Sequence, residues 1–251
     1  MYNHTVINGQ REETSVNKFT GKVFLYMFIA LMITALVAGL VGFIFKRAFP
    51  LDETGSVIVD GAINESLAKP YFILLIVSFI VYIPLIIWIQ VQTFRGKGSI
   101  MVPFIIYSIV MGVIMSAMTM FVDWSVISLS FAVTSVLFLG MFLIGFFSKK
   151  DLSFLSFIAF GILIGVVFIS LFNVIWMLFF PGFTVMNWFV SYGLLAFVIL
   201  ITIFDFNRVR RIAENQPENN NLALICAFNL YVDFIYLFIR VLALVSRFMK
   251  K

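Results

Sequence analysis

The stretch LALICAFNLYVDFIYLFIRVLALV, residues 222–245, decides what kind of fold this chain adopts. It exceeds the roughly 20 apolar residues that a helix needs to cross the hydrocarbon core of a membrane. Its formally charged side chains are Asp233 and Arg240. The stretch therefore predicts a transmembrane helix that carries a carboxyl group at membrane depth.

The composition of the whole chain indicates the same class of protein. Of the 251 residues, 63% are hydrophobic and 12% are charged, whereas a soluble domain has about 25% charged residues. The net charge of +5 comes from basic residues in short segments between apolar runs, as the positive-inside rule describes. The sequence thus predicts an integral protein of the lipid bilayer, and no nucleic acid is expected as a partner.

Six further runs have the length and apolarity of membrane spans, and because lipid offers the backbone no hydrogen-bond partners, all seven must be helices. The predicted spans are Val23–Phe45, Tyr71–Val91, Ile100–Val122, Val126–Phe147, Phe154–Phe180, Met186–Phe204 and Leu222–Val245. We expect an all-α, polytopic helix bundle: a polar cytoplasmic tail at 1–22 and one seven-helix domain at 23–248. Most connectors are short, and the two longer ones are 46–70 and 206–221.

The distribution of Lys and Arg predicts the orientation. Ten of them flank the spans on the side of the N-terminus and three flank the other side, which places the N-terminus in the cytoplasm. Seven crossings would put Arg247, Lys250 and Lys251 outside, against the rule. Either the rule is overridden there, or the last segment is re-entrant.

Two aspartates are the candidate functional residues. Asp233 lies inside the last span and Asp205 ends the sixth, and intramembrane carboxyl groups usually face a cavity or a partner because they cost roughly 2.5–3.5 kcal/mol to insert. Tyr236 and Arg240 follow Asp233 at helical spacing, so they are secondary candidates on the same face. Asp233 lies roughly 16 Å along its span, so it meets Asp205 only if the sixth helix continues past its apolar run or the seventh begins before its own.

If the two carboxyl groups meet, they would titrate as one pair and act as a pH sensor. They would also attract Ca²⁺, which prefers carboxylate and carbonyl oxygens. Two carboxylates fall short of a full coordination shell, so transient binding during transit is expected rather than storage. With one cysteine, Cys226, and one histidine, His4, no metal-ligand cluster or nucleophile–base pair is visible, and we expect neither an enzyme nor a cofactor.

Four stretches resemble the Bax inhibitor-1 family, the transmembrane Bax-inhibitor-motif proteins, and its bacterial branch in particular. SKKDLSFL and LYVDFI, within the second and last of these stretches, are the most specific parts. The stretches are KVFLYMFIALMITALVAGL (22–40), FAVTSVLFLGMFLIGFFSKKDLSFLSFIAFGILIGVVFISLFN (131–173), IFDFNRVRRI (203–212) and LYVDFIYLFIRVL (230–242).

The resemblance implies a seven-helix bundle with the last helix central, and a pH-dependent Ca²⁺ leak. It implies that Asp205 and Asp233 form the family's aspartate pair, with Arg95 as a latch for Asp205. The chain departs from the family at FDFN, where a tyrosine hydroxyl is lost before Asp205, and its second helix lacks the acidic residue of some members.

The leading hypothesis is therefore a pH-sensitive, Ca²⁺-permeable leak channel. The alternatives are a proton-coupled secondary transporter, although no repeat between the halves is apparent, and a non-conducting membrane regulator of a protein partner such as a quality-control protease. The expected location is the cell membrane, a bacterial plasma membrane by the small size of the chain, or the endoplasmic reticulum in a eukaryote.

Overall fold

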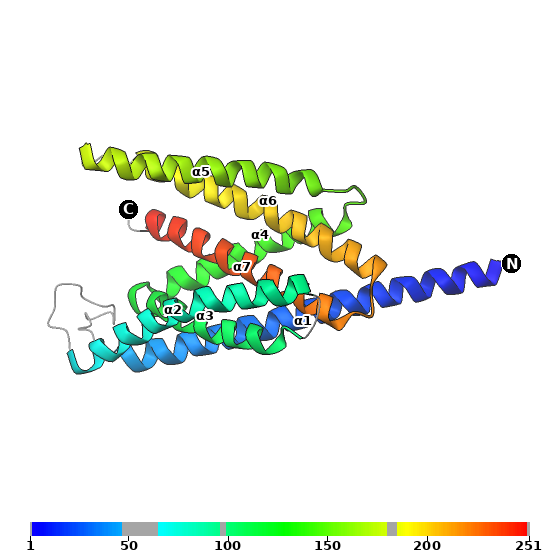
Figure 1. Ribbon diagram of the computed structural model, residues 1–251, viewed down its shortest axis with the longest axis horizontal. Helices are drawn as coiled ribbons and strands as arrows, with labels where there is room; N and C mark the ends of the chain where they lie inside the picture. Colours follow the sequence, from blue (N-terminus) through cyan, green and yellow to red (C-terminus); the bar gives the residue numbers. More distant parts are fainter. Residues whose placement is uncertain (1, 47–64, 96–98, 180–184, 250–251) are drawn as a thin grey trace. The chain divides into compact units, whose positions relative to one another are not determined.

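The structure of the protein, a computed structural model, describes residues 2–46, 65–95, 99–179 and 185–249. Within these ranges the chain forms seven α-helices and no strand (Figure 1). The helices are α1 (Tyr2–Lys46), α2 (Glu65–Arg95), α3 (Met101–Phe121), α4 (Trp124–Phe147), α5 (Ser153–Phe179), α6 (Val185–Asn215) and α7 (Asn220–Met249).

Each helix contains a stretch long and apolar enough to cross a membrane, so the predicted all-α, seven-span architecture is confirmed. The last helix differs from the others in burial. In α7, 67% of the most apolar window is buried, against at most 50% in the other described spans. This burial agrees with the expected central position of the last helix, because a helix covered on most sides by protein has little surface left for lipid.

Several helices, α6 and α7 among them, extend further than the apolar runs predict. The connector expected at 206–221 is mostly helical, since α6 continues to Asn215 and α7 begins at Asn220, leaving a turn at residues 216–219. The expectation was wrong there because a helix satisfies its backbone hydrogen bonds internally and can continue into water. Hydropathy marks where a helix meets lipid and does not mark where it ends.

The described helices group into two compact units. The first unit comprises Met1–Thr20, Leu129–Glu218 and Val232–Lys251, and therefore contains most of α4, α5, α6 and the C-terminal part of α7. The second unit comprises Gly21–Ser128 and Asn219–Tyr231, and so contains most of α1, α2, α3 and the start of α7. Helix α7 thus contributes to both.

Glycines allow helices to approach closely within each unit. In the second unit, a Cβ atom on Gly112 of α3 would lie 2.7 Å from the Val37 Cβ of α1 and 2.8 Å from the Thr34 carbonyl oxygen. In the first unit, a Cβ on Gly145 of α4 would overlap the Ile203 carbonyl of α6 and lie 2.8 Å from the Phe206 Cβ. Small residues at such positions let helix backbones pack together, which is the main source of association between helices in lipid.

Candidate functional site

The candidate site lies in the first unit, where α6 and α7 bring two carboxyl groups together. Asp233 of α7 is buried, with 7% of its surface exposed. Its carboxyl group is within hydrogen-bonding reach of the Asp205 carboxyl and of the Thr202 hydroxyl, both on α6. The two aspartates that the sequence singled out are therefore in direct contact.

The length of the two helices makes this contact possible. Asp205 ends the apolar run of α6, yet the helix continues to Asn215, and α7 begins before its own apolar run. Both helices therefore have the extra length that allows the two aspartates to meet. Thr202 and Asp205 are three residues apart, and this spacing places both side chains on one face of α6.

An aromatic cluster holds the two helices beside the carboxyl pair. Phe206 and Phe234 directly follow the two aspartates, and both contact Phe138 of α4 with ring centroids 4.9 and 5.2 Å apart, respectively. All three rings are at most 7% exposed. Since each ring sits next to the backbone of α6 or α7, this packing fixes the register in which the carboxyl groups meet.

The hydrogen bonding of the pair has a direct chemical consequence. A carboxylate only accepts hydrogen bonds, so two carboxyl groups can bond to each other only when a proton lies between them. Thr202 donates its own hydroxyl proton to the Val198 carbonyl at 2.7 Å. Among the described residues, the Asp233 Oδ2 atom has no hydrogen-bond partner, so this oxygen remains an acceptor.

Besides the two aspartates, the residues to consider at the site are Arg208, Tyr236, Arg240 and Arg95. Arg208, which was not predicted, lies one turn after Asp205 and acts on it electrostatically. Tyr236 is 41% exposed, unlike Asp233, and it interacts electrostatically with the half-buried Arg240 one turn further on. Arg95 is the last residue of α2, and its side chain lies outside the described part of the structure.

A second polar centre, which the sequence analysis did not predict, is built on Asn207 of α6. Asn207 is 1% exposed, and its Nδ2 donates to the carbonyl oxygens of Gly145, Ser148 and Lys150 at 3.2, 3.3 and 3.2 Å. Its Oδ1 accepts the Leu152 N–H at 3.3 Å. The side chain thus ties the connection between α4 and α5 to α6, two residues from Asp205. The signal that could have found it is an amide inside IFDFNRVRRI, one of the four stretches that resemble the family.

Charged side chains also bind the connection between α4 and α5 on its exposed side. Arg211 forms a salt bridge with Asp151 at 2.8 Å, and the Arg210 guanidinium donates to the Ser148 carbonyl at 3.0 Å. The Ser153 hydroxyl and backbone N–H both donate to the Asp151 Oδ1, and with Arg211 they lower the pKa of this exposed carboxyl below its ordinary value. The motif SKKDLS is therefore a structural loop in which Asp151 is ionised at neutral pH.

Comparison with known proteins identifies the family to which the chain belongs. The family model described as "Inhibitor of apoptosis-promoting Bax1" matches residues 16–250. The chain belongs to the Bax inhibitor-1 family. The match includes both helices of the carboxyl pair and the α4–α5 connection, so the resemblance that the sequence motifs suggested is confirmed.

Several proteins similar to this one come from bacteria. YrjE of Lactococcus lactis is 27% identical over 249 residues, covering 97% of this chain and 96% of its own length. The inner membrane protein YbhL of Escherichia coli is 32% identical over 145 residues, which covers 55% of this chain and 59% of YbhL. A membrane protein of Streptococcus pyogenes is 32% identical over 152 residues, 57% of this chain and 62% of its own length. This Bax inhibitor-1 protein is accordingly a multi-pass membrane protein.

The candidate site contains two carboxyl groups, and the described residues include no cluster of three or more His, Cys, Asp or Glu side chains that could hold a metal ion. Two carboxylates provide at most four oxygen ligands, whereas Ca²⁺ takes about six to eight. The geometry can therefore hold a proton between the carboxyl groups or offer part of a coordination shell to a cation that keeps most of its water.

Proposed function

We propose that this Bax inhibitor-1 protein is a pH-sensitive, Ca²⁺-permeable leak channel in which Asp205 and Asp233 form the proton sensor. The observation that carries the proposal is the contact between the two carboxyl groups, one of them buried in the most enclosed helix of the protein. A buried pair that binds one proton changes its net charge when that proton leaves, and this change is what a gate needs.

The physical step is the loss of the shared proton. While the proton is present, the pair is held together by a hydrogen bond and carries a single negative charge. When the proton leaves as the pH rises, two adjacent carboxylates repel each other in a poorly solvated site, and the pair titrates as a unit. Repulsion between α6 and α7 then favours a different arrangement of the two helices, and a nearby cation would stabilise it.

Candidate cations for the ionised state are a side chain and a permeant ion. Arg208 already acts on Asp205, and Arg95 is the latch that the family resemblance implies. Ca²⁺ is the proposed permeant ion because it is a hard cation that prefers carboxylate oxygens. Since the pair supplies only part of a coordination shell, binding would be weak enough for the ion to leave.

The test is Ca²⁺ flux in proteoliposomes that contain purified protein, with Asp233→Asn compared with the unchanged chain. We compare the flux at about pH 6 and about pH 8 and expect a severalfold difference in the unchanged protein, because the pair loses its shared proton as the pH rises. The asparagine keeps the shape of the side chain and cannot ionise, so the variant should conduct at a rate that no longer depends on pH.

Asp151→Asn is the matched control, since Asp151 is an exposed carboxyl whose pKa lies below its ordinary value. It is ionised throughout the tested range and should leave the pH response unchanged. A pH response in Asp233→Asn equal to that of the unchanged protein would refute the sensor. Protein that passes no ion at any pH would refute the channel and favour the non-conducting regulator instead.

A further inference from the structure

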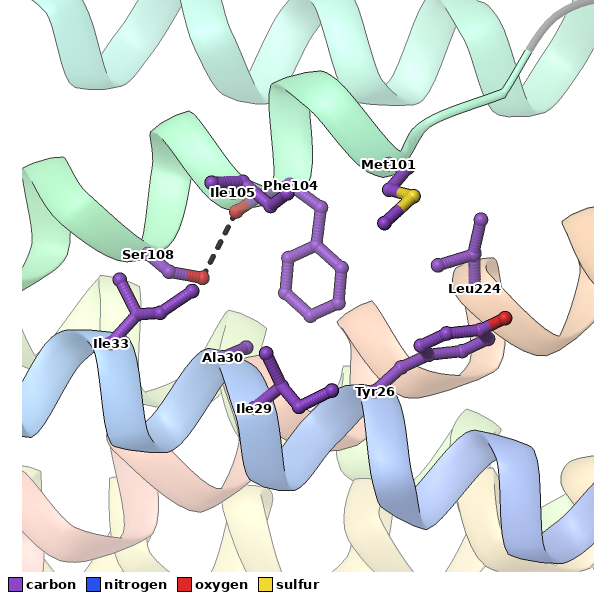
Figure 2. Close-up of a pocket in the computed structure, with 9 residues that line it drawn as sticks. All are labelled: Tyr26, Ile29, Ala30, Ile33, Met101, Phe104, Ile105, Ser108 and Leu224. Carbon is purple, nitrogen blue, oxygen red and sulfur yellow. Dashed lines mark hydrogen bonds between the residues drawn. The ribbon is translucent and has the colours of Figure 1, made fainter.

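The second unit contains an apolar cavity of about 70 Å³ between α1, α3 and the start of α7 (Figure 2). Its lining residues are Tyr26, Ile29, Ala30, Ile33, Met101, Phe104, Ile105, Ser108 and Leu224. In Figure 2 the Phe104 ring points from α3 toward α1, and the Ser108 hydroxyl donates to the Phe104 carbonyl at 2.9 Å. Because this hydroxyl is already bonded to its own helix, the cavity offers a ligand an apolar wall.

The rim of the cavity is exposed on the surface of the protein. Ile29, Met101 and Ile105 on the rim are 45, 49 and 38% exposed, whereas Ala30, Phe104 and Ser108 are at most 4% exposed. All these residues belong to spans that are apolar enough to lie in a membrane. Exposed apolar side chains in such spans meet lipid chains, so the cavity is accessible to an acyl chain.

One end of the cavity is positively charged. Lys22 precedes Tyr26 by four residues on α1, and Asn220 precedes Leu224 by four residues on α7, so each lies one helical turn beyond a lining residue. The Lys22 ammonium donates to the Asn220 Oδ1 at 2.7 Å. An ammonium has three donors, so two remain for a ligand. Lys22 also directly precedes the apolar run of α1, where lipid headgroups begin.

We propose that this cavity, together with Lys22, is a binding site for an anionic phospholipid of the leaflet nearest the N-terminus. Part of one acyl chain lies in the cavity, and the headgroup phosphate binds the Lys22 ammonium. Tyr26 lies on α1 between the rest of the cavity lining and Lys22, and its hydroxyl points toward the N-terminal part of α1 (Figure 2). This position suits a tyrosine at the membrane–water interface. The argument is independent of the aspartate pair, which lies in the other unit.

The test is native mass spectrometry of the purified full chain titrated with phosphatidylglycerol and with phosphatidylcholine. We expect one tightly bound phosphatidylglycerol, and about fivefold weaker binding of this lipid in Lys22→Gln, the loss expected for one basic side chain near the surface. Binding of the zwitterionic lipid should weaken less, because its choline group already offsets the charge of the phosphate. Lys46→Gln removes the same charge at the other end of α1 and should leave both affinities unchanged.

Ala30→Leu tests the apolar part, because Ala30 lines the cavity and a larger side chain would fill it. We expect weaker binding of both lipids. Should that variant fail to fold, a phosphatidylglycerol with a photoreactive acyl chain is added to the unchanged protein, and cross-links on peptides containing Tyr26, Met101 or Phe104 support the site. Equal binding of the two lipids by the unchanged protein, cross-links elsewhere, or cross-links that join two copies of the chain would overturn it.

Discussion

At the scale of single residues, the buried polar side chains of Asn207 in α6 and Asp233 in α7 differ in how completely their polar atoms are hydrogen-bonded. Asn207 uses both ends of its amide, with bonds to three carbonyl groups and one N–H. Asp233 leaves Oδ2 without a hydrogen-bond partner among the described residues. Unsatisfied polar atoms are costly in a buried place. Asn207 is therefore explained by stability alone, whereas the arrangement of Asp233 requires another reason, such as exchange of a proton.

The bonding of Asn207 predicts a large loss of stability in Asn207→Ala. The substitution removes the four hydrogen bonds that Asn207 makes to backbone groups at the end of α4 and in the α4–α5 connection, at about 1 kcal/mol for each lost bond, so we expect a loss of about 2–4 kcal/mol. Thermal unfolding of the purified protein, followed by circular dichroism in detergent, measures it. Asn215→Ala is the control, because Asn215 is exposed and its amide donates only to the Arg211 carbonyl. Equal unfolding temperatures for the two variants would contradict this role.

The sequence predicted the aspartates but not Asn207, and the reason is physical. A carboxyl group in an apolar run is conspicuous whatever it contacts, because insertion into lipid is costly. Asn207 lies among polar residues at the end of a span, where an amide is ordinary. Its importance comes from carbonyl groups about 60 residues earlier in the chain, and no local pattern reveals such a partner.

At the scale of helices, the apolar runs of the sequence predicted where the membrane spans lie but not the residues at which the helices begin and end. α6 and α7 both extend past their apolar runs, and this added length brings Asp205 to Asp233. The sequence also could not show which glycines lie at close contacts between helices, because glycines occur both on faces that contact another helix and on faces that do not. On α4, Gly140 has nothing within 4 Å of an added Cβ, whereas Gly145 meets the backbone of α6.

These two glycines predict opposite effects of the same substitution. Gly145→Ala should destabilise the protein by about 1–3 kcal/mol, because the methyl group overlaps the Ile203 carbonyl and forces α4 away from α6. Gly140→Ala should leave stability unchanged or raise it by up to about 1 kcal/mol, because alanine is the better helix former. Chemical denaturation of both variants in the same detergent gives the comparison. A stable Gly145→Ala protein would show that α4 and α6 can move apart freely.

At the scale of the whole molecule, the number of crossings decides where the C-terminus lies. The sequence left two alternatives open, a full crossing against the positive-inside rule or a re-entrant last segment. A re-entrant segment needs a break in the helix at membrane depth. α7 is continuous over 30 residues and contains neither Gly nor Pro. At 1.5 Å per residue it is roughly 45 Å long, which exceeds the roughly 30 Å hydrocarbon core.

We therefore predict that α7 crosses the membrane completely and that the two termini lie on opposite sides. Single cysteines are introduced as Asn17→Cys and Met249→Cys, both at exposed positions, in a background where the buried Cys226 is replaced by alanine. In intact cells, a membrane-impermeant maleimide should label the cysteine at 249 and should label the one at 17 only after permeabilisation. Asp123→Cys, in the turn between α3 and α4, serves as the external reference. Protection of both terminal cysteines in intact cells would establish instead that α7 returns to the cytoplasmic side, and the positive-inside rule would then hold for Arg247 as well.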